Sequence, residues 1–176
     1  YEQDFVITEA AKAATLNENT NIITSACHGL IANDRVAFSV IDGELPCGII
    51  ATESYFVLAA GLTEYSFQIS NTSGGSAIDF TIISPSATYL IGKVVNLTSY
   101  TFDSDIRLSY DVGVSASFVC TVINATAGKL RLSLTAATTV ALAAAAYVWD
   151  LKLISGGNSY FYAKGSVTVE ATSSRT

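Results

Sequence analysis

The sequence predicts an all-β protein, with a small barrel or sandwich followed by an immunoglobulin-like β-sandwich. Three observations support this: short stretches in which apolar and polar residues alternate, turn residues about every ten positions, and a composition rich in Thr, Ser, Ala, Val and Ile with only 2 Pro. The chain has 176 residues, 50% of them hydrophobic and 14% charged. It can therefore form one large domain or two small ones with a real core.

The first half begins weakly and then becomes regular. Residues 1–10 alternate only weakly, and the Ala-rich residues 9–14 favour an extended arm with a short helix. A polar turn at 17–20 precedes a candidate strand at 21–25. Clearer strands follow at 35–40, 54–59 and 65–70, separated by turn residues at 42–43, 46–48, 61–64 and 73–76, and residues 77–83 lead out.

The second half repeats the β pattern with a different layout. Alternating residues predict strands near 105–110, 117–123 and 129–134, a short helical turn at 135–142, a hairpin closed by residues 155–158, and a last strand ending near 169. About seven strands in roughly 90 residues fit an immunoglobulin-like sandwich. Residues 84–87 (Ser-Pro-Ser-Ala) are the best linker candidate. We therefore expect two domains, an N-terminal arm plus small β-barrel at 1–84 and a β-sandwich at 85–176.

The charge is acidic and uneven. The net charge is −6, so the chain offers no basic surface for phosphates, and we expect no nucleic-acid partner. Residues 1–90 carry ten acidic and two basic side chains, whereas residues 91–176 carry five acidic and seven basic ones. This asymmetry is either chance combined with solubility or a head-to-tail contact between neighbouring copies.

Neither the cysteines nor the apolar runs indicate an extracellular or membrane protein. An odd number of cysteines without paired spacing is a poor disulfide framework, so we expect Cys27, Cys47 and Cys120 to be reduced and partly buried. No apolar run reaches membrane-spanning length, and we expect no membrane partner. The chain starts at Tyr1 rather than Met, which suggests a longer precursor, and no signal peptide is in view.

A first group of residues resembles a known module. These are His28-Gly29-Leu30, Asn33-Asp34-Arg35-Val36-Ala37-Phe38, Gly43-Glu44-Leu45-Pro46-Cys47-Gly48-Ile49, Ser54-Tyr55-Phe56-Val57, Ser66-Phe67-Gln68-Ile69-Ser70 and Gly74-Gly75-Ser76-Ala77-Ile78-Asp79-Phe80. They resemble the small β-barrel module of bacteriophage virion proteins, which is often described as similar to the first catalytic-cysteine half-domain of ubiquitin-activating enzymes. The resemblance implies a barrel fold and no ubiquitin chemistry, since nothing here supplies nucleotide binding or a matched catalytic cysteine.

A second group resembles another virion domain. It comprises Val95-Asn96-Leu97-Thr98-Ser99-Tyr100, Asp105-Ile106-Arg107, Ala127-Gly128-Lys129-Leu130-Arg131-Leu132-Ser133-Leu134-Thr135, Ala146-Tyr147-Val148-Trp149-Asp150-Leu151 and Gly165-Ser166-Val167-Thr168-Val169. It is similar to the immunoglobulin-like domain that begins phage baseplate upper proteins and related fibre and decoration proteins. The resemblance implies a domain that docks onto other virion proteins. Ala146 stands where that family often has Gly, and Gly156-Gly157-Asn158 serves as the turn.

The candidates for chemistry favour structural roles. His28 is the single histidine, and adjacent strand residues point to opposite faces, so it would not meet Cys27; we expect its side chain to cap a backbone group in a turn. The carboxylates of Asp34, Asp42 and Glu44 lie in predicted turns and are not placed as a glycosidase pair. A calcium site from Asp103, Asp105 and Asp111 fits no dedicated calcium loop. We therefore predict no catalytic, cofactor-binding or metal-binding residues, and no enzyme.

Aromatic residues gather in the last hairpin and form the candidate interface: Trp149, Tyr160, Phe161 and Tyr162. We expect Trp149 on the same face as Tyr147, as a core aromatic of the sandwich. Strand alternation places Tyr160 and Tyr162 on one face and Phe161 on the other, so at least one face is exposed or lies in an interface. A sugar-stacking platform is the alternative.

The expected function follows mainly from the two resemblances. We expect a non-enzymatic structural component of a tailed-bacteriophage particle, namely a capsid decoration or cement protein acting through multivalent contacts. The alternatives are a tail, baseplate or fibre adaptor, and a carbohydrate-binding module. The expected partners are other virion proteins, either the major capsid protein or tail and baseplate proteins, and copies of the chain itself as a homo-oligomer. The expected location is the virion, assembled in the bacterial host cytoplasm.

Overall fold

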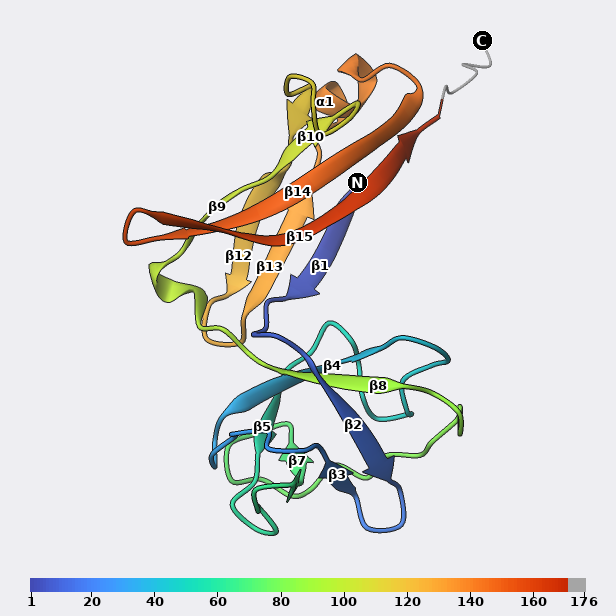
Figure 1. Cartoon of the computed structure of the whole chain (residues 1–176), viewed down its shortest axis with the longest axis vertical. Helices are drawn as coiled ribbons and strands as arrows, with labels where there is room; N and C mark the ends of the chain where they lie inside the picture. The colour runs from blue at the N-terminus through green and yellow to red at the C-terminus, as the bar shows by residue number, and fades with distance from the viewer. Residues whose placement is uncertain (171–176) are drawn as a thin grey trace. The chain divides into compact units, whose positions relative to one another are not determined.

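The computed structural model describes residues 1–170, in which nearly all regular structure is β-strand. The strands form a nearly closed antiparallel barrel of seven strands and two other antiparallel sheets (Figure 1). The all-β prediction and the barrel prediction are confirmed. Within residues 1–170, no helix has the length and apolar character that a membrane span needs.

The chain divides into two compact units. The barrel unit comprises Phe5–Leu97 and Asn124–Lys129, and the sheet unit comprises Tyr1–Asp4, Thr98–Ile123 and the described residues from Leu130 onward. Residues 85–97 thus belong to the barrel unit by their contacts. The predicted domains, 1–84 and 85–176, are segments that we expect to fold independently, and they stay a prediction. Residues 171–176 of the second predicted domain lie outside the described part of the chain.

The barrel unit is one curled sheet in the order β6-β3-β2-β8-β4-β5-β7. Its strands are β2 (Lys12–Asn17), β3 (Ile22–Thr24), β4 (Arg35–Val40), β5 (Tyr55–Val57), β6 (Ser66–Phe67), β7 (Ile69–Ser70) and β8 (Tyr89–Lys93). β6 pairs with β3 and β7 pairs with β5, yet only Gln68 separates β6 from β7 in sequence. One short segment therefore joins the two ends of the sheet, and this curls it into a barrel.

The inside of the barrel is filled by side chains from every strand. Alternation along β4 buries Val36 and Phe38, and Phe38 meets Tyr55 edge-on with ring centroids 5.9 Å apart. The core comprises Ala14, Ile23, Leu30, Val36, Phe38, Ile49, Tyr55, Val57, Phe67, Ile69, Phe80 and Ile91. The inside of the barrel is thus a packed core, as expected for so few strands.

Two features of the barrel differ from the sequence expectation. The helix predicted at 9–14 is wrong: residues 12–14 begin β2 and pair with β8, because sheet pairing overrides the helix preference of Ala. β8 itself was not predicted. It pairs with both β2 and β4, so it is central, and both faces of its middle are buried, which removes the alternating pattern.

A turn from late in the sequence completes the barrel unit. In residues 124–129, the Ala125 carbonyl accepts from Leu97 N–H and the Gly128 carbonyl accepts from Ile7 N–H, both at 2.9 Å. Gly128 has φ +65°, and a Cβ there would lie 2.6 Å from Val94 Cγ1 and 2.9 Å from the Ile7 carbonyl. The position therefore requires glycine for both its backbone angle and its close approach.

The sheet unit holds most of the residues of the two smaller sheets. One has the order β1-β13-β12 and the other the order β11-β10-β14-β15, with β9 also pairing with β14. Their strands are β1 (Glu2–Val6), β9 (Thr101–Asp103), β10 (Asp105–Arg107), β11 (Ala116–Ser117), β12 (Val119–Asn124), β13 (Lys129–Ser133), β14 (Ala145–Ser155) and β15 (Asn158–Val169). A short 3-10 helix covers Leu97–Ser99, at the unit boundary, and the predicted helical turn is α1 (Ala136–Ala141), capped by the Thr135 side chain.

Both sheets of this unit contribute buried side chains. Leu130 and Leu132 of β13, Ile106 of β10 and Leu151 of β14 are at most 1% exposed. The chain passes from one sheet to the other at Phe118, which separates β11 from β12 and donates its N–H to the Ser104 carbonyl at 2.9 Å. The predicted strand at 117–123 is thus one segment that changes sheets.

We expect Gly128→Ala to destabilise the barrel unit by about 3 kcal/mol, because a left-handed backbone costs about 1 kcal/mol for alanine and the clash with Val94 adds about 1–3 kcal/mol. Gly74→Ala is the matched control, since Gly74 has a similar φ of +68° with nothing within 4 Å of the added Cβ. Urea unfolding of both variants measures the difference. Equal losses would show that the packing around Gly128 contributes nothing.

Candidate functional site

The β14–β15 hairpin presents the predicted aromatic residues on its returning strand. β15 is the last strand of its sheet and forms the long hairpin arm seen in Figure 1. The pairing register shifts between Leu151 and Lys152: Ala163 lies opposite Leu151 and Phe161 opposite Lys152. Tyr162 is therefore the extra residue of a β-bulge, a feature that re-aims neighbouring side chains. Strand alternation alone does not describe this hairpin.

Trp149 lies apart from these exposed aromatic residues. It is half-buried, directly opposite Gly165, and a Cβ on Gly165 would lie 2.7 Å from its Nε1 atom. Its ring meets Phe118 edge-on, with centroids 6.1 Å apart. Trp149 thus packs over Gly165 of β15 and against Phe118, at which the chain changes sheets. These contacts give Trp149 a structural role.

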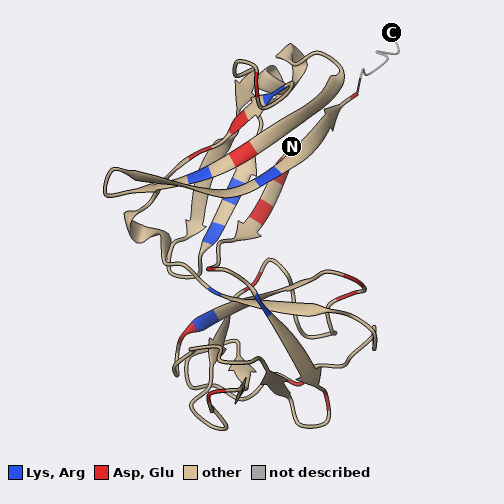
Figure 2. Cartoon of the chain, in the orientation of Figure 1, with Lys and Arg blue, Asp and Glu red and all other residues tan. Residues whose placement is uncertain are grey.

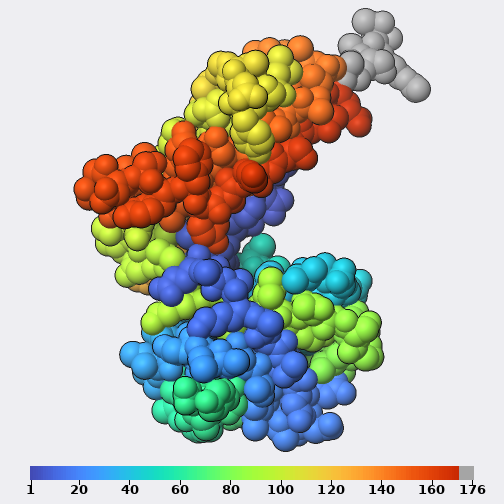
Figure 3. Space-filling view, in the orientation of Figure 1, coloured from blue at the N-terminus to red at the C-terminus, as the bar shows by residue number. Residues whose placement is uncertain are grey.

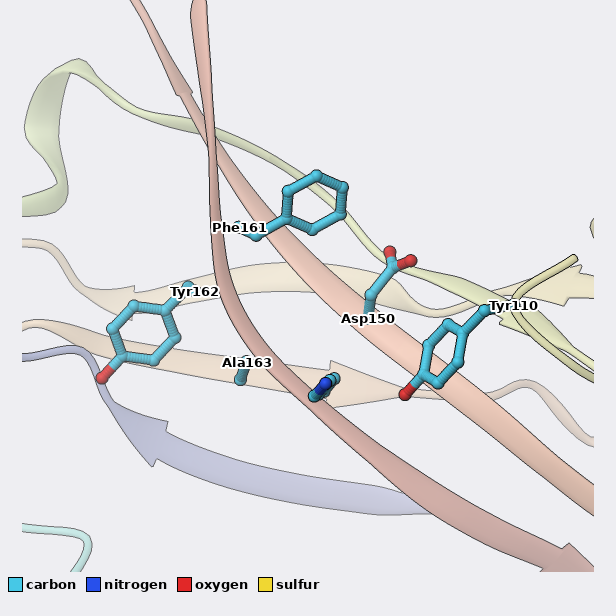
Figure 4. Close-up of a pocket in the computed structure, with 6 residues that line it drawn as sticks. Tyr110, Asp150, Phe161, Tyr162 and Ala163 are labelled. Carbon is cyan, nitrogen blue, oxygen red and sulfur yellow. The ribbon is translucent and has the colours of Figure 1, made fainter.

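A groove lies beside the bulge. It has a volume of about 440 Å³ and is lined by Tyr110, Asp150, Phe161, Tyr162, Ala163 and Lys164. In Figure 4, Phe161 and Tyr110 flank Asp150, while Tyr162 projects from the other side of β15. Phe161 is 76% exposed and Tyr110 is 50% exposed. The groove therefore has accessible aromatic walls and a carboxylate between them.

A compact group of charges lies beneath the groove. Asp150 is 6% exposed; its Oδ2 accepts from Arg107 at 2.8 Å, while its Oδ1 is buried with no hydrogen-bond partner. Arg107 also donates to Asp105 at 2.5 Å. Lys152 Nζ lies 3.5 Å from Asp103, 3.7 Å from Asp105 and 3.9 Å from Asp150. Acidic and basic side chains thus lie together in this one group, and Figure 2 shows one acidic and one basic segment along β14.

Each aromatic wall also has a lysine nearby. Lys152 Nζ lies 5.4 Å from the centroid of the Phe161 ring, and Lys164 Nζ lies 5.9 Å from that of Tyr110. Both distances are within the range of cation–π attraction. These contacts favour the ring positions seen around the groove.

His28 takes the predicted capping role in the barrel unit. Its Nδ1 accepts from Leu30 N–H at 3.0 Å, and its ring meets Phe67 edge-on at 5.1 Å. The side chain of neighbouring Cys27 contacts Glu64 instead, with its sulfur 3.8 Å from Oε1. The structure does not bring a thiol to the imidazole.

The carboxylates considered as acids or ligands do not converge. Asp34 accepts from Ile31 N–H at 3.0 Å and pairs with Lys93 at 2.8 Å, and Asp42 and Glu44 are exposed. Asp103 and Asp105 pair with Lys152, whereas Asp111 is exposed in a loop. Among residues 1–170, no group of three His, Cys, Asp or Glu side chains is arranged to hold a metal ion.

Part of the charge asymmetry is matched inside the chain. In the sheet unit Arg131 makes a two-pronged contact with Asp4 at 2.6 and 3.0 Å, and it lies 3.3 Å from Glu2. The hydrogen bond with Asp4, followed by the charges of Asp4 and Glu2, raises the pKa of Arg131. In the barrel unit Lys129 pairs with Glu53. A charge contact between copies remains a prediction.

The sequence analysis located two of the six residues that line the groove. It singled out Phe161 and Tyr162, and it missed Tyr110, Asp150 and Lys164. Asp150 had a signal, since it is an acidic residue in the middle of an apolar strand. No sequence signal singled out Tyr110 as a groove residue. Alternation predicted that it lies in a strand, but β10 ends at Arg107 and Tyr110 lies in the following loop. Comparisons with protein families, curated proteins and solved structures found no match.

We expect Arg107→Gln to destabilise the protein by about 3 kcal/mol, because it leaves the buried Asp150 charge without its main partner. Chemical denaturation of the variant and of the wild type at pH 7 measures this loss. Arg131→Gln, which removes a more exposed ion pair, should cost much less; equal losses for the two variants would contradict the role given to Asp150.

The three cysteines should differ in reactivity. Cys27 and Cys47 are exposed, which corrects the expectation that all three are partly buried, and Cys120 is half-buried. Burial, then the charge of Asp103, raises the pKa of Cys120 to about 11. At pH 8 about one Cys120 in a thousand is then the reactive thiolate. We expect iodoacetamide to label two sites in the native chain and three in denaturant, as read by peptide mass spectrometry. Rapid native labelling of Cys120 would contradict this.

Proposed function

We propose that this chain is a non-enzymatic structural protein of a tailed-bacteriophage particle and that it acts as a capsid decoration or cement protein. The sequence resemblances to two virion modules support the particle assignment. Its partners would be the major capsid protein and copies of itself, met in the virion after assembly in the host cytoplasm.

We further propose that the sheet unit is an immunoglobulin-like sandwich. Strands that change sheets form the corners of β-sandwiches, and the passage at Phe118 is of this kind. Trp149, half-buried beside Phe118, would be the aromatic residue that packs in such a sandwich. Buried side chains from both sheets are also consistent with this fold.

The observation that carries the functional proposal is that the sheet unit has long, uncovered strand edges. β12 and β15 are the last strands of their sheets, and no strand in residues 1–170 pairs with their outer sides. β12 exposes Val119, Val122 and Ile123, and β15 exposes Tyr160 and Phe161. In Figure 3 the hairpin of β14 and β15, orange to red, lies open at the surface.

Uncovered apolar edges favour assembly. An exposed edge strand presents free backbone donors and acceptors to another chain, and proteins that remain single usually block it with charges, Pro or a covering segment. β12 carries no charged residue at all. On a particle, many identical copies would each make such a contact, and weak contacts would add up through multivalency.

The test is the copy number of the chain in purified particles of the phage that encodes it, measured by quantitative mass spectrometry. We expect hundreds of copies. A few to dozens would instead indicate a tail, baseplate or fibre adaptor. Complete absence from the particle would refute the proposal.

Variants locate the contact. Val122→Lys and Tyr160→Lys place a charge on the two edges, and we expect each to lower incorporation at least about tenfold if its edge is buried in the particle. Val140→Lys is the matched control, because Val140 is 86% exposed on α1 and not on a strand edge. Normal incorporation of both edge variants would exclude the edges as the docking surface.

A further inference from the structure

The groove beside the bulge has the features of a ligand site. We propose that it binds a neutral saccharide, held between Tyr110 and Phe161. This goes beyond the particle assignment and does not depend on it. The groove volume of about 440 Å³ is within the range of small-molecule sites, about 300–1,000 Å³.

The walls suit the apolar faces of sugar rings. Tyr110 and Phe161 come from different segments and flank the same carboxylate (Figure 4). The faces of aromatic rings are electron-rich, so they attract the C–H groups that a pyranose presents on one side. The nearby lysines favour the positions that the Phe161 and Tyr110 rings take around the groove. A ligand would therefore have to order these two side chains less, which lowers the entropic cost of binding.

The floor supplies polar partners for hydroxyl groups. Asp150 Oδ1 is buried, accepts no hydrogen bond, and lies 3.9 Å from Lys152 Nζ. A buried acceptor without a donor is unfavourable, and a ligand hydroxyl would satisfy it once the Phe161 or Lys152 side chain turns aside. Lys164, also in the lining, offers a donor to a second ligand oxygen.

The charge balance selects a neutral ligand. Three acidic side chains, Asp103, Asp105 and Asp150, are matched by three basic ones, Arg107, Lys152 and Lys164. A phosphate or acidic sugar would find every base already near an acid or an aromatic ring, and a cationic peptide would meet two lysines at the groove. Neither an anionic nor a cationic ligand therefore gains electrostatic energy in the groove. The hydroxyl groups of a neutral sugar, in contrast, can form hydrogen bonds with both acidic and basic side chains.

The experiment titrates the full chain with maltohexaose, cellohexaose and chitohexaose, followed by saturation-transfer NMR and calorimetry. We expect at least one neutral hexasaccharide to bind, and Tyr110→Ala or Phe161→Ala to weaken that binding about tenfold or more. Tyr160→Ala is the matched control: Tyr160 is 55% exposed and adjacent to Phe161, but it does not line the groove. The affinity of the Tyr160→Ala variant for the sugar should stay within about twofold of the wild-type affinity.

Thermal melting of each variant checks that the fold persists, and Lys164→Gln gives a second, exposed variant that should also weaken binding. The proposal is overturned if none of the three sugars binds. It is equally overturned if the wall variants bind as the wild type does, or if a polygalacturonate hexamer or an oligolysine peptide binds better than every neutral sugar. None of these outcomes bears on the copy number in particles, so the two proposals can fail separately.

Discussion

The ion pair between Asp150 and Arg107 constrains how β10 and β14 pair in the sheet unit. Asp150 lies in the middle of β14 with its carboxylate almost fully buried, and Arg107 at the end of β10 reaches it at 2.8 Å. A buried charge without a partner costs several kcal/mol, so β10 must pair with β14 in the register that places Ile106 opposite Trp149. That register also fixes where the loop carrying Tyr110 begins.

The groove follows from this register together with the bulge. Asp150 provides its floor, the loop after β10 provides Tyr110, and the shift at Leu151 and Lys152 sets Phe161 opposite Lys152. A regular hairpin would have placed Tyr162 opposite Lys152 instead. The bulge thus decides which aromatic ring stands beside the carboxylate.

Local patterns anticipated local structure, and the failures come from pairing across the chain. The alternation of Leu130, Leu132 and Leu134 predicts β13 well, because one face of that strand is buried. β8 has no such signal, since it is central and buried on both faces. The bulge and the position of Tyr110 depend on how β14 meets its neighbours, which no stretch of sequence encodes alone. His28 was anticipated because its contact with Leu30 is only two residues away.

The turn at residues 124–129 makes the barrel unit discontinuous in sequence, with consequences for how the chain is made. Translation yields residues 5–97 first, but the Ile7 and Leu97 amides that bond to this turn receive their acceptors only about thirty residues later. During synthesis these two backbone donors therefore lack their acceptors until part of the second unit has been made. Completion of the barrel unit therefore depends on synthesis of part of the sheet unit, and a chain that ended before residue 124 would lack the turn that completes the barrel unit.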